Sequence, residues 1–113
     1  MSDLLVICKK TCTTCRKAVA LLEELGVTFT YREYTKEPLS ADELRDVLGK
    51  LGLAPSSLLR SREMKKVGLE GDEGDDALIE AMAANPNLIQ RPIYVKGDEA
   101  RIGRPPETVK ELL

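Results

Sequence analysis

The stretch LLVICKKTCTTCRKA, residues 4–18, decides the fold, because two kinds of hydrophobic pattern meet in it. It opens on LLVIC, an almost continuous apolar run with β-branched members, which is typical of a strand buried on both faces. After KKTCTT the apolar residues recur with helical spacing, at Ala18, Leu21, Leu22 and Leu25. Gly26 then supplies a stop signal for a helix. The stretch therefore predicts a strand that leads directly into a helix.

The segment TFTYREYT, residues 28–35, alternates in polarity and predicts a second strand. Residues 4–35 together predict a β-α-β unit. Such crossovers are right-handed almost without exception, so we expect the two strands to lie parallel in one sheet.

Residues from about 40 to 86 predict a helical insertion. Ser40 and Glu43 have the spacing of a capping box, and the apolar stripe Leu44, Val47, Leu48 and Leu51 follows them. Further helices are expected around Ser56–Arg60, from Ser61 to Gly68, and over residues 76–84.

The remaining sequence predicts β-structure again. RPIYV at 91–95 and EARIG at 99–103 are joined by a KGD turn, which favours an antiparallel hairpin. PPETVKELL has prolines suited to the first turn of a closing helix. The order β-α-β, helices, β-β-α predicts one α/β domain over residues 1–113, with a four-stranded mixed sheet.

Composition excludes several classes of function. The chain has 113 residues, 42% of them apolar and 32% charged, with a net charge of -2, so we expect a soluble globular protein without general attraction to nucleic acid or anionic membranes. No apolar run approaches the roughly 20 residues of a membrane span. The N-terminal sequence lacks the pattern of a signal peptide, so a cytoplasmic location is expected. Three cysteines and no histidine indicate reactive thiols that are activated without imidazole.

Cys12 and Cys15 stand two residues apart at the predicted start of the first helix. The N-terminus of a helix carries partial positive charge and unpaired N–H groups, which stabilise a thiolate over a thiol. The nearby bases, Lys9, Lys10, Arg16 and Lys17, add positive potential. Cys15, one turn further along, would be placed to attack a mixed disulfide formed at Cys12.

Other readings of the cysteines stay open at this point. The pair could be inert packing, although four neighbouring bases argue against that. Half of a zinc site is disfavoured because tetrahedral zinc needs four ligands, which this chain could supply only as a dimer sharing two pairs. Cys8, inside the apolar strand, reads as buried filler.

Three arginines stand out by context. Arg60 follows the apolar SSLL, whereas Arg91 and Arg104 each precede a proline. The residue before proline is driven to extended backbone, so the latter two side chains should leave the ends of strands. Guanidinium groups match the geometry of tetrahedral oxyanions. Each arginine, taken alone, could instead serve surface solubility or form a salt bridge. The sequence does not show that the three side chains converge on one site.

The chain resembles the arsenate reductase family of thioredoxin-like folds, the branch that also contains the Spx transcription regulators. The resemblance extends over essentially the whole chain, and it is carried by TCTTCRKA, LLRSR, LIQRPIYV and IGRPPETVKELL in this order. It implies that Cys12 is the nucleophile on arsenate and that Arg60, Arg91 and Arg104 bind the oxyanion. It also implies a cis-proline at Pro92 and glutathione or glutaredoxin as reductant. We further expect that no metal or prosthetic group is bound and that the protein is a monomer.

Two positions depart from the better-known reductases. Those enzymes have a histidine at the position of Cys8 and a residue other than cysteine at the position of Cys15. An internal Cys12–Cys15 disulfide could therefore resolve the reaction or act as a sensor. Two alternatives follow: an Spx-like redox regulator that binds RNA polymerase, and a general thiol–disulfide oxidoreductase. Arg104 favours the reductase, because the Spx pattern tends to lose this arginine.

Overall fold

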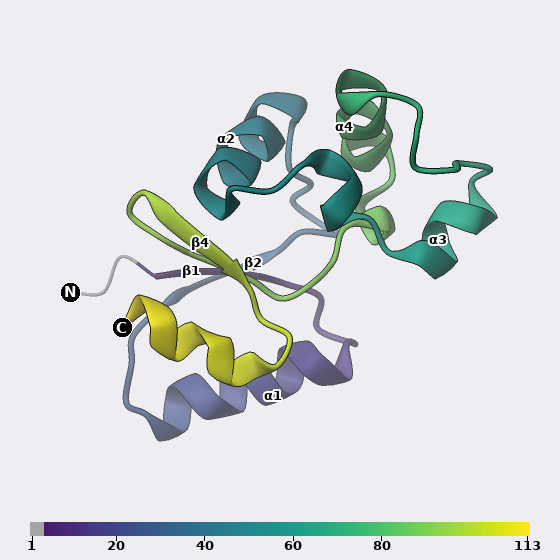
Figure 1. Cartoon of the computed structure of the whole chain (residues 1–113). Coiled ribbons are helices and arrows are strands. Elements are labelled where there is room, and N and C mark those ends of the chain that lie inside the picture. The colour runs from purple at the N-terminus through teal and green to yellow at the C-terminus, as the bar shows by residue number, and fades with distance from the viewer. Residues whose placement is uncertain (1–3) are drawn as a thin grey trace. The chain divides into compact units, whose positions relative to one another are not determined.

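The structure is a computed structural model that describes residues 4–113. Residues 1–3, which belong to the domain expected from the sequence, lie outside the described residues. The chain divides into two compact units. One unit comprises the residues up to Glu37 together with Arg91–Leu113, and the other comprises Pro38–Gln90. Figure 1 shows the elements of both.

The first unit is built on a four-stranded mixed sheet in the order β2-β1-β3-β4. Its strands are β1 (Leu5–Cys8), β2 (Thr30–Glu33), β3 (Ile93–Lys96) and β4 (Glu99–Ile102). β1 pairs with β2 in parallel, and the other two pairings, β1 with β3 and β3 with β4, are antiparallel. The sequence-based α/β fold and its mixed sheet are thereby confirmed.

Strand β3 begins at Ile93 and not at Arg91 as the sequence suggested. Pro92 lacks the N–H group that a sheet ladder requires, so the strand starts after it. Its carbonyl oxygen instead accepts a hydrogen bond of 2.8 Å from the N–H of Gly103. Arg91 therefore lies in the loop that leads into the strand.

Helix α1 (Thr13–Glu24) follows β1 after a short loop. Cys12 is its N-cap residue, in extended conformation with φ -82° and ψ 126°. Gly26, with φ 70°, ends the segment in the left-handed region that glycine adopts at least cost. The inward face of α1 is lined by Cys15, Ala18 and Leu22.

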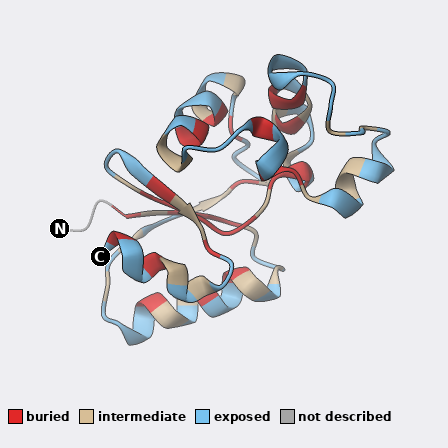
Figure 2. Ribbon diagram, viewed as in Figure 1, coloured by how far each residue is buried: buried red, intermediate tan, exposed pale blue. Residues whose placement is uncertain are grey.

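The closing segment is a 3-10 helix, η3 (Pro106–Leu112), where the sequence predicted a helix of unspecified type. Its buried residues, Val109 and Leu112, join one hydrophobic core with β1 and α1. Figure 1 shows η3 beside α1 on one face of the sheet, and Figure 2 shows the buried residues of both. The remaining buried members of this core are Leu4, Val6, Cys8, Cys15, Ala18, Leu22 and Tyr94. All three cysteines thus lie in or against this core, since Cys12 packs on it.

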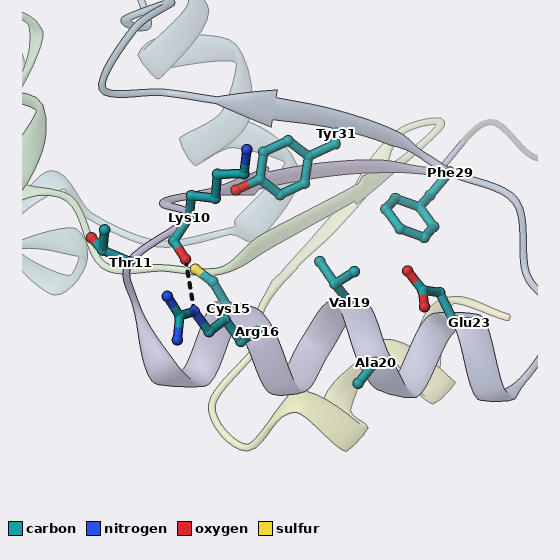
Figure 3. Close-up of a pocket in the computed structure, with 9 residues that line it drawn as sticks. All are labelled: Lys10, Thr11, Cys15, Arg16, Val19, Ala20, Glu23, Phe29 and Tyr31. Carbon is teal, nitrogen blue, oxygen red and sulfur yellow. Dashed lines mark hydrogen bonds between the residues drawn. The ribbon is translucent and has the colours of Figure 1, made fainter.

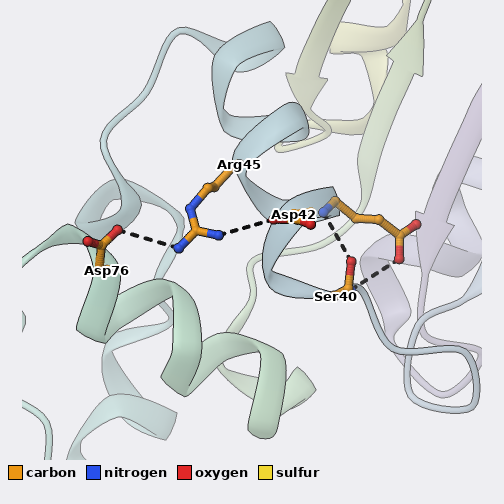
Figure 4. Close-up of polar contacts among 5 residues, drawn as sticks. Ser40, Asp42, Arg45 and Asp76 are labelled. Carbon is orange, nitrogen blue, oxygen red and sulfur yellow. Dashed lines mark hydrogen bonds and ion pairs between the residues drawn. The ribbon is translucent and has the colours of Figure 1, made fainter.

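The second unit consists of helices. They are α2 (Ala41–Leu51), η1 (Pro55–Leu58), α3 (Ser61–Lys66), α4 (Asp75–Ala84) and η2 (Pro86–Leu88). The capping box expected at Ser40 is present: its hydroxyl accepts from the N–H of Glu43 at 3.1 Å, and the Glu43 carboxylate accepts from the Ser40 N–H at 3.1 Å. In Figure 4, Arg45 of α2 lies between Asp42 and Asp76, with ion pairs of 3.3 and 3.4 Å. Helices α2 and α4 pack on each other.

Within residues 4–113, no helix has both the length and the apolar character needed to cross a bilayer.

Candidate active site

Cys12 stands where the sheet unit turns from loop into helix. Its N–H donates to the carbonyl oxygen of Lys9 at 3.0 Å, and its own carbonyl oxygen accepts from the N–H of Arg16 at 3.0 Å. The second bond is the first of the helical ladder. The Cys12 side chain is half-buried. Because Cys12 is the N-cap residue, its side chain lies at the positive end of α1.

Cys15 and Cys8 form a buried pair behind Cys12. Their exposed fractions are 1% and 0%, and both side chains belong to the same hydrophobic core. The N–H of Lys9 also donates to Sγ of Cys15, at 3.3 Å. The interaction with Cys8 lowers the pKa of the Cys15 thiol, against the opposing effect of burial and with further help from the Lys9 N–H, Cys12 and Arg91. The same interaction, together with burial, raises the pKa of Cys8.

Arg91 is the buried cation of the site, with an exposed fraction of 7%. Its Nη1 donates to the hydroxyl oxygen of Tyr34 at 2.9 Å. Burial opposes the charge of Arg91, but its interactions with Cys12 and Tyr34 outweigh burial and raise its pKa. Its Nε has no hydrogen-bond partner among the described residues. A buried guanidinium with an unused donor can bind an anion that arrives beside Cys12.

Arg104 is tied to Arg91 through the backbone. Nε of Arg104 donates to the main-chain carbonyl oxygen of Arg91 at 2.8 Å. The Arg91–Pro92 and Arg104–Pro105 peptide bonds are both cis.

Gly103 allows the close approach of these two loops. A Cβ atom at this position would lie 2.6 Å from Cγ of Pro92 and 2.6 Å from Cε2 of Tyr94, so only glycine fits.

Arg60 belongs to the helical unit. It is the N-cap residue of α3, and its Nη1 donates to the carbonyl oxygen of Asn87 at 3.2 Å. It also forms an ion pair of 4.0 Å with Glu63. Of the residues singled out from the sequence, Cys12, Cys15, Arg91, Pro92 and Arg104 lie in the sheet unit, and Arg60 lies in the helical unit.

Two residues that sequence reasoning missed support the cysteine loop. Glu33, at the end of β2, accepts from the N–H of Lys10 at 2.7 Å and from the Thr35 hydroxyl at 2.7 Å. Burial opposes ionisation of Glu33, but these bonds outweigh burial and lower its pKa. Tyr34, the other missed residue, holds Arg91. Both residues could have been identified from their position at the carboxyl end of β2, which pairs in parallel with β1.

A cavity of about 750 Å³ opens beside this loop, between α1 and β2. Figure 3 shows Cys15 in its wall, with Arg16 donating from Nε to the carbonyl oxygen of Lys10 at 3.0 Å. The lining residues are Lys10, Thr11, Cys15, Arg16, Val19, Ala20, Glu23, Phe29 and Tyr31. Two cationic side chains and a sulfur atom thus share one cavity.

The described residues contain no group of three or more histidine, cysteine or acidic side chains that could hold a metal ion.

Comparison with known protein families gives one match over nearly the whole chain. A sequence model described as the ArsC family matches residues 8–112. Among curated proteins, a Neisseria meningitidis arsenate reductase is 34% identical over 117 residues, which cover 100% of both chains. An Escherichia coli protein, named only as uncharacterized protein YfgD, is 41% identical over 106 residues, covering 90% of this chain and 89% of its own.

Solved structures give the same relationship. An arsenate reductase from Vibrio cholerae superposes with a TM-score of 0.89 at 34% sequence identity, covering 99% of this chain and 98% of the other.

Proposed function

The chain belongs to the ArsC family, a family of thiol-dependent oxidoreductases, and from this premise we propose that it reduces arsenate, or an oxyanion of the same shape, at Cys12. The relatives named arsenate reductase match it over its whole length. The proposal goes further than that membership, because it assigns roles to individual residues.

In the first step the Cys12 thiolate attacks arsenic. An S–As bond forms, one As–O bond breaks, and the departing hydroxyl group of arsenate takes up a proton from solvent and leaves as water. In the second step the Cys15 thiolate attacks the sulfur of Cys12, so that an S–S bond forms and the S–As bond breaks. The electron pair of the broken bond stays on arsenic, which leaves as arsenite, and the two thiols have become a disulfide.

An external dithiol or two molecules of glutathione then reduce the Cys12–Cys15 disulfide, and a glutaredoxin is the protein partner we expect. No metal or prosthetic group takes part in this cycle. The need for a reduced thiol pool fits the cytoplasm.

The observation that carries the proposal is the environment of Arg91. A guanidinium that is 7% exposed, interacts electrostatically with Cys12 and has an Nε without a hydrogen-bond partner among the described residues can stabilise both a Cys12 thiolate and an oxyanion next to it. Arg104, which is hydrogen-bonded to the backbone of Arg91, adds a second guanidinium. We assign Arg60 as the third on the strength of its motif alone.

The test is glutathione-dependent arsenate reduction by the wild-type protein beside Cys12→Ser, Cys15→Ser and Arg91→Lys. We expect Cys12→Ser to be inactive and both others to be impaired. The matched control is Arg101→Lys, because Arg101 of β4 is ion-paired with Glu111 at 3.1 Å and has no role in the cycle. Full arsenate turnover by Cys12→Ser would rule the proposal out, whereas full turnover by Cys15→Ser would remove only its resolving role.

The same preparation distinguishes a general thiol–disulfide oxidoreductase. Such a protein would reduce a small disulfide substrate through Cys12 and Cys15. Neither the Arg91→Lys substitution nor added arsenate would change that activity. Arsenite production that depends on Arg91 is the outcome that separates the two activities.

A further inference from the structure

The cavity between α1 and β2 has no part in the proposed cycle. Its volume of about 750 Å³ lies within the range of roughly 300–1,000 Å³ in which proteins bind small molecules. It shares Cys15 with the redox pair, but neither Cys12 nor Arg91 is among the described residues that line it. The cavity is therefore separate from the oxyanion site and can take a ligand of its own.

The middle of this cavity is apolar on both sides. Helix α1 contributes Val19 and Ala20, and the sheet side contributes Phe29, just before β2, and Tyr31 within it. Figure 3 shows Val19 directed toward the two aromatic rings. Tyr31 is 37% exposed, so the described residues leave much of this aromatic side chain uncovered. An apolar ligand body that packs here would remove that surface from water.

Two cations, Lys10 and Arg16, stand together at the end of the cavity beside the cysteine loop (Figure 3). Arg16 donates from Nε to the carbonyl oxygen of Lys10 at 3.0 Å, which fixes the guanidinium at this end. Within residues 4–113, neither its two Nη groups nor Nζ of Lys10 has an ion-pair or hydrogen-bond partner. A carboxylate can accept two parallel N–H bonds from such a guanidinium. This end of the cavity therefore favours a ligand with an anionic head group.

Glu23 gives the opposite end of the cavity the opposite charge. It follows Arg16 on the same helix by seven residues, which corresponds to about 10 Å along the helix axis. A ligand with one negative group can place that group at the cationic end and keep only apolar atoms near Glu23. Glutathione fits this polarity poorly, because it carries a carboxylate at each end and one of them would face Glu23.

We propose that this cavity binds a small monocarboxylate with an aromatic or aliphatic body. The carboxylate pairs with Lys10 and Arg16, and the body packs on Val19, Phe29 and Tyr31. Arsenate and phosphate are not ligands of this site, since they have no apolar part to bury. The inference concerns reversible binding alone and does not depend on arsenate reduction.

The first experiment titrates the wild-type protein with phenylbutyrate and, separately, with phenylbutyramide, and follows the backbone amides by NMR. The two probes have the same body and differ in the charge of the head group. We expect saturable shifts around the cavity, at Thr11, Arg16, Val19 and Phe29, and binding of the amide about threefold to tenfold weaker than that of the acid. Equal dissociation constants for the two probes would overturn the proposal. Shifts centred on other residues would do the same, as would the absence of saturable binding below about 10 mM.

Two substitutions test the head group and the body of the ligand separately. Lys10→Gln removes one cation from an exposed side chain, so we expect the acid to bind about threefold more weakly and the amide as before. Lys17→Gln is the matched control, because Lys17 is also exposed and is not among the described residues that line the cavity. Equal losses for both variants would mean that net charge alone attracts the acid, which would overturn the proposal.

Val19→Phe fills the apolar middle of the cavity with a ring, so both probes should bind about tenfold more weakly or not at all. The NMR spectrum of the variant shows whether it is folded. Unchanged binding by a folded Val19→Phe protein would overturn the proposal. If this variant does not fold, the comparison of Lys10→Gln with Lys17→Gln decides.

S-methylglutathione separates this class of ligand from the reductant of the proposed cycle, since its thioether cannot react with the cysteines. We expect it to leave the shifts caused by phenylbutyrate unchanged when the two are present at equal concentration. Displacement of phenylbutyrate at equal or lower concentration would identify a glutathione site and overturn the inference. No titration contains arsenate, so the inference can fail while arsenate reduction stands, and the reverse also holds.

Discussion

Nε of Arg104 donates a hydrogen bond of 2.8 Å to the main-chain carbonyl oxygen of Arg91. The acceptor is backbone, so the link is independent of the conformation of the Arg91 side chain. Arg91 is buried, whereas Arg104 is largely exposed. The exposed arginine is therefore oriented by the loop that carries the buried one, and its two Nη groups remain for a ligand.

Replacing Arg104 by lysine tests this orientation. Lysine keeps the charge but has neither the Nε donor nor the planar fork that binds an oxyanion through two bonds. We expect kcat/KM for arsenate to fall by about tenfold or more. The measurement is steady-state kinetics, with Arg101→Lys as the control for a surface arginine on the neighbouring strand. Equal kinetics for Arg104→Lys and the wild type would show that charge alone suffices at this position.

Tyr34→Phe removes the acceptor of the 2.9 Å bond from Nη1 of Arg91. Tyr34 is 0% exposed, so the change leaves a buried N–H group unpaired, which costs about 1–3 kcal/mol in the free energy of unfolding. Urea denaturation measures this loss. Tyr31→Phe is the matched control, because that tyrosine is 37% exposed and the bond from its hydroxyl to Glu33 is long, at 3.4 Å. Similar unfolding free energies for the two variants would speak against a structural role of the Tyr34 hydroxyl.

Gly103→Ala tests the close approach between the Pro92 loop and Tyr94. The new methyl group would lie 2.6 Å from atoms of both residues, so the backbone has to move, at a cost of about 1–3 kcal/mol in the free energy of unfolding. Gly49→Ala is the control: its methyl group meets nothing within 4 Å in helix α2, and we expect a gain of about 0.5–1 kcal/mol. The midpoints of thermal unfolding should therefore move in opposite directions. A stable Gly103→Ala variant with normal activity would refute the steric argument.

Much of the fold could be predicted because its signals are local. A few adjacent residues determine each of these features: the capping box at Ser40, the strand that ends at Cys8, and the cysteine at the start of a helix. The extended conformation before each proline likewise depends only on the neighbouring residue.

The contacts that complete the site are of another kind. The bond between Tyr34 and Arg91 joins residues 57 positions apart, and it depends on the register of a parallel strand pair. The burial of Cys8 and Cys15 in one core depends on how α1 packs against β1. No local pattern encodes the bond between Tyr34 and Arg91, which is why Tyr34 attracted no attention in the sequence.

Glu33→Gln tests how the cysteine loop is anchored, through its effect on acid stability. The pKa of Glu33 is lowered in the folded protein, because hydrogen bonds from Thr35 and the Lys10 N–H outweigh burial. A depressed pKa contributes stability above the unfolded value of about 4.3, and this contribution is lost as the pH falls through the folded value. The variant should therefore be less stable than the wild type at pH 7, and the difference should shrink toward pH 3. Urea unfolding at several pH values measures this convergence, with the exposed Glu24→Gln of α1 as control. A difference in unfolding free energy that stays constant down to pH 3 would mean that Glu33 acts through its shape and not through its charge.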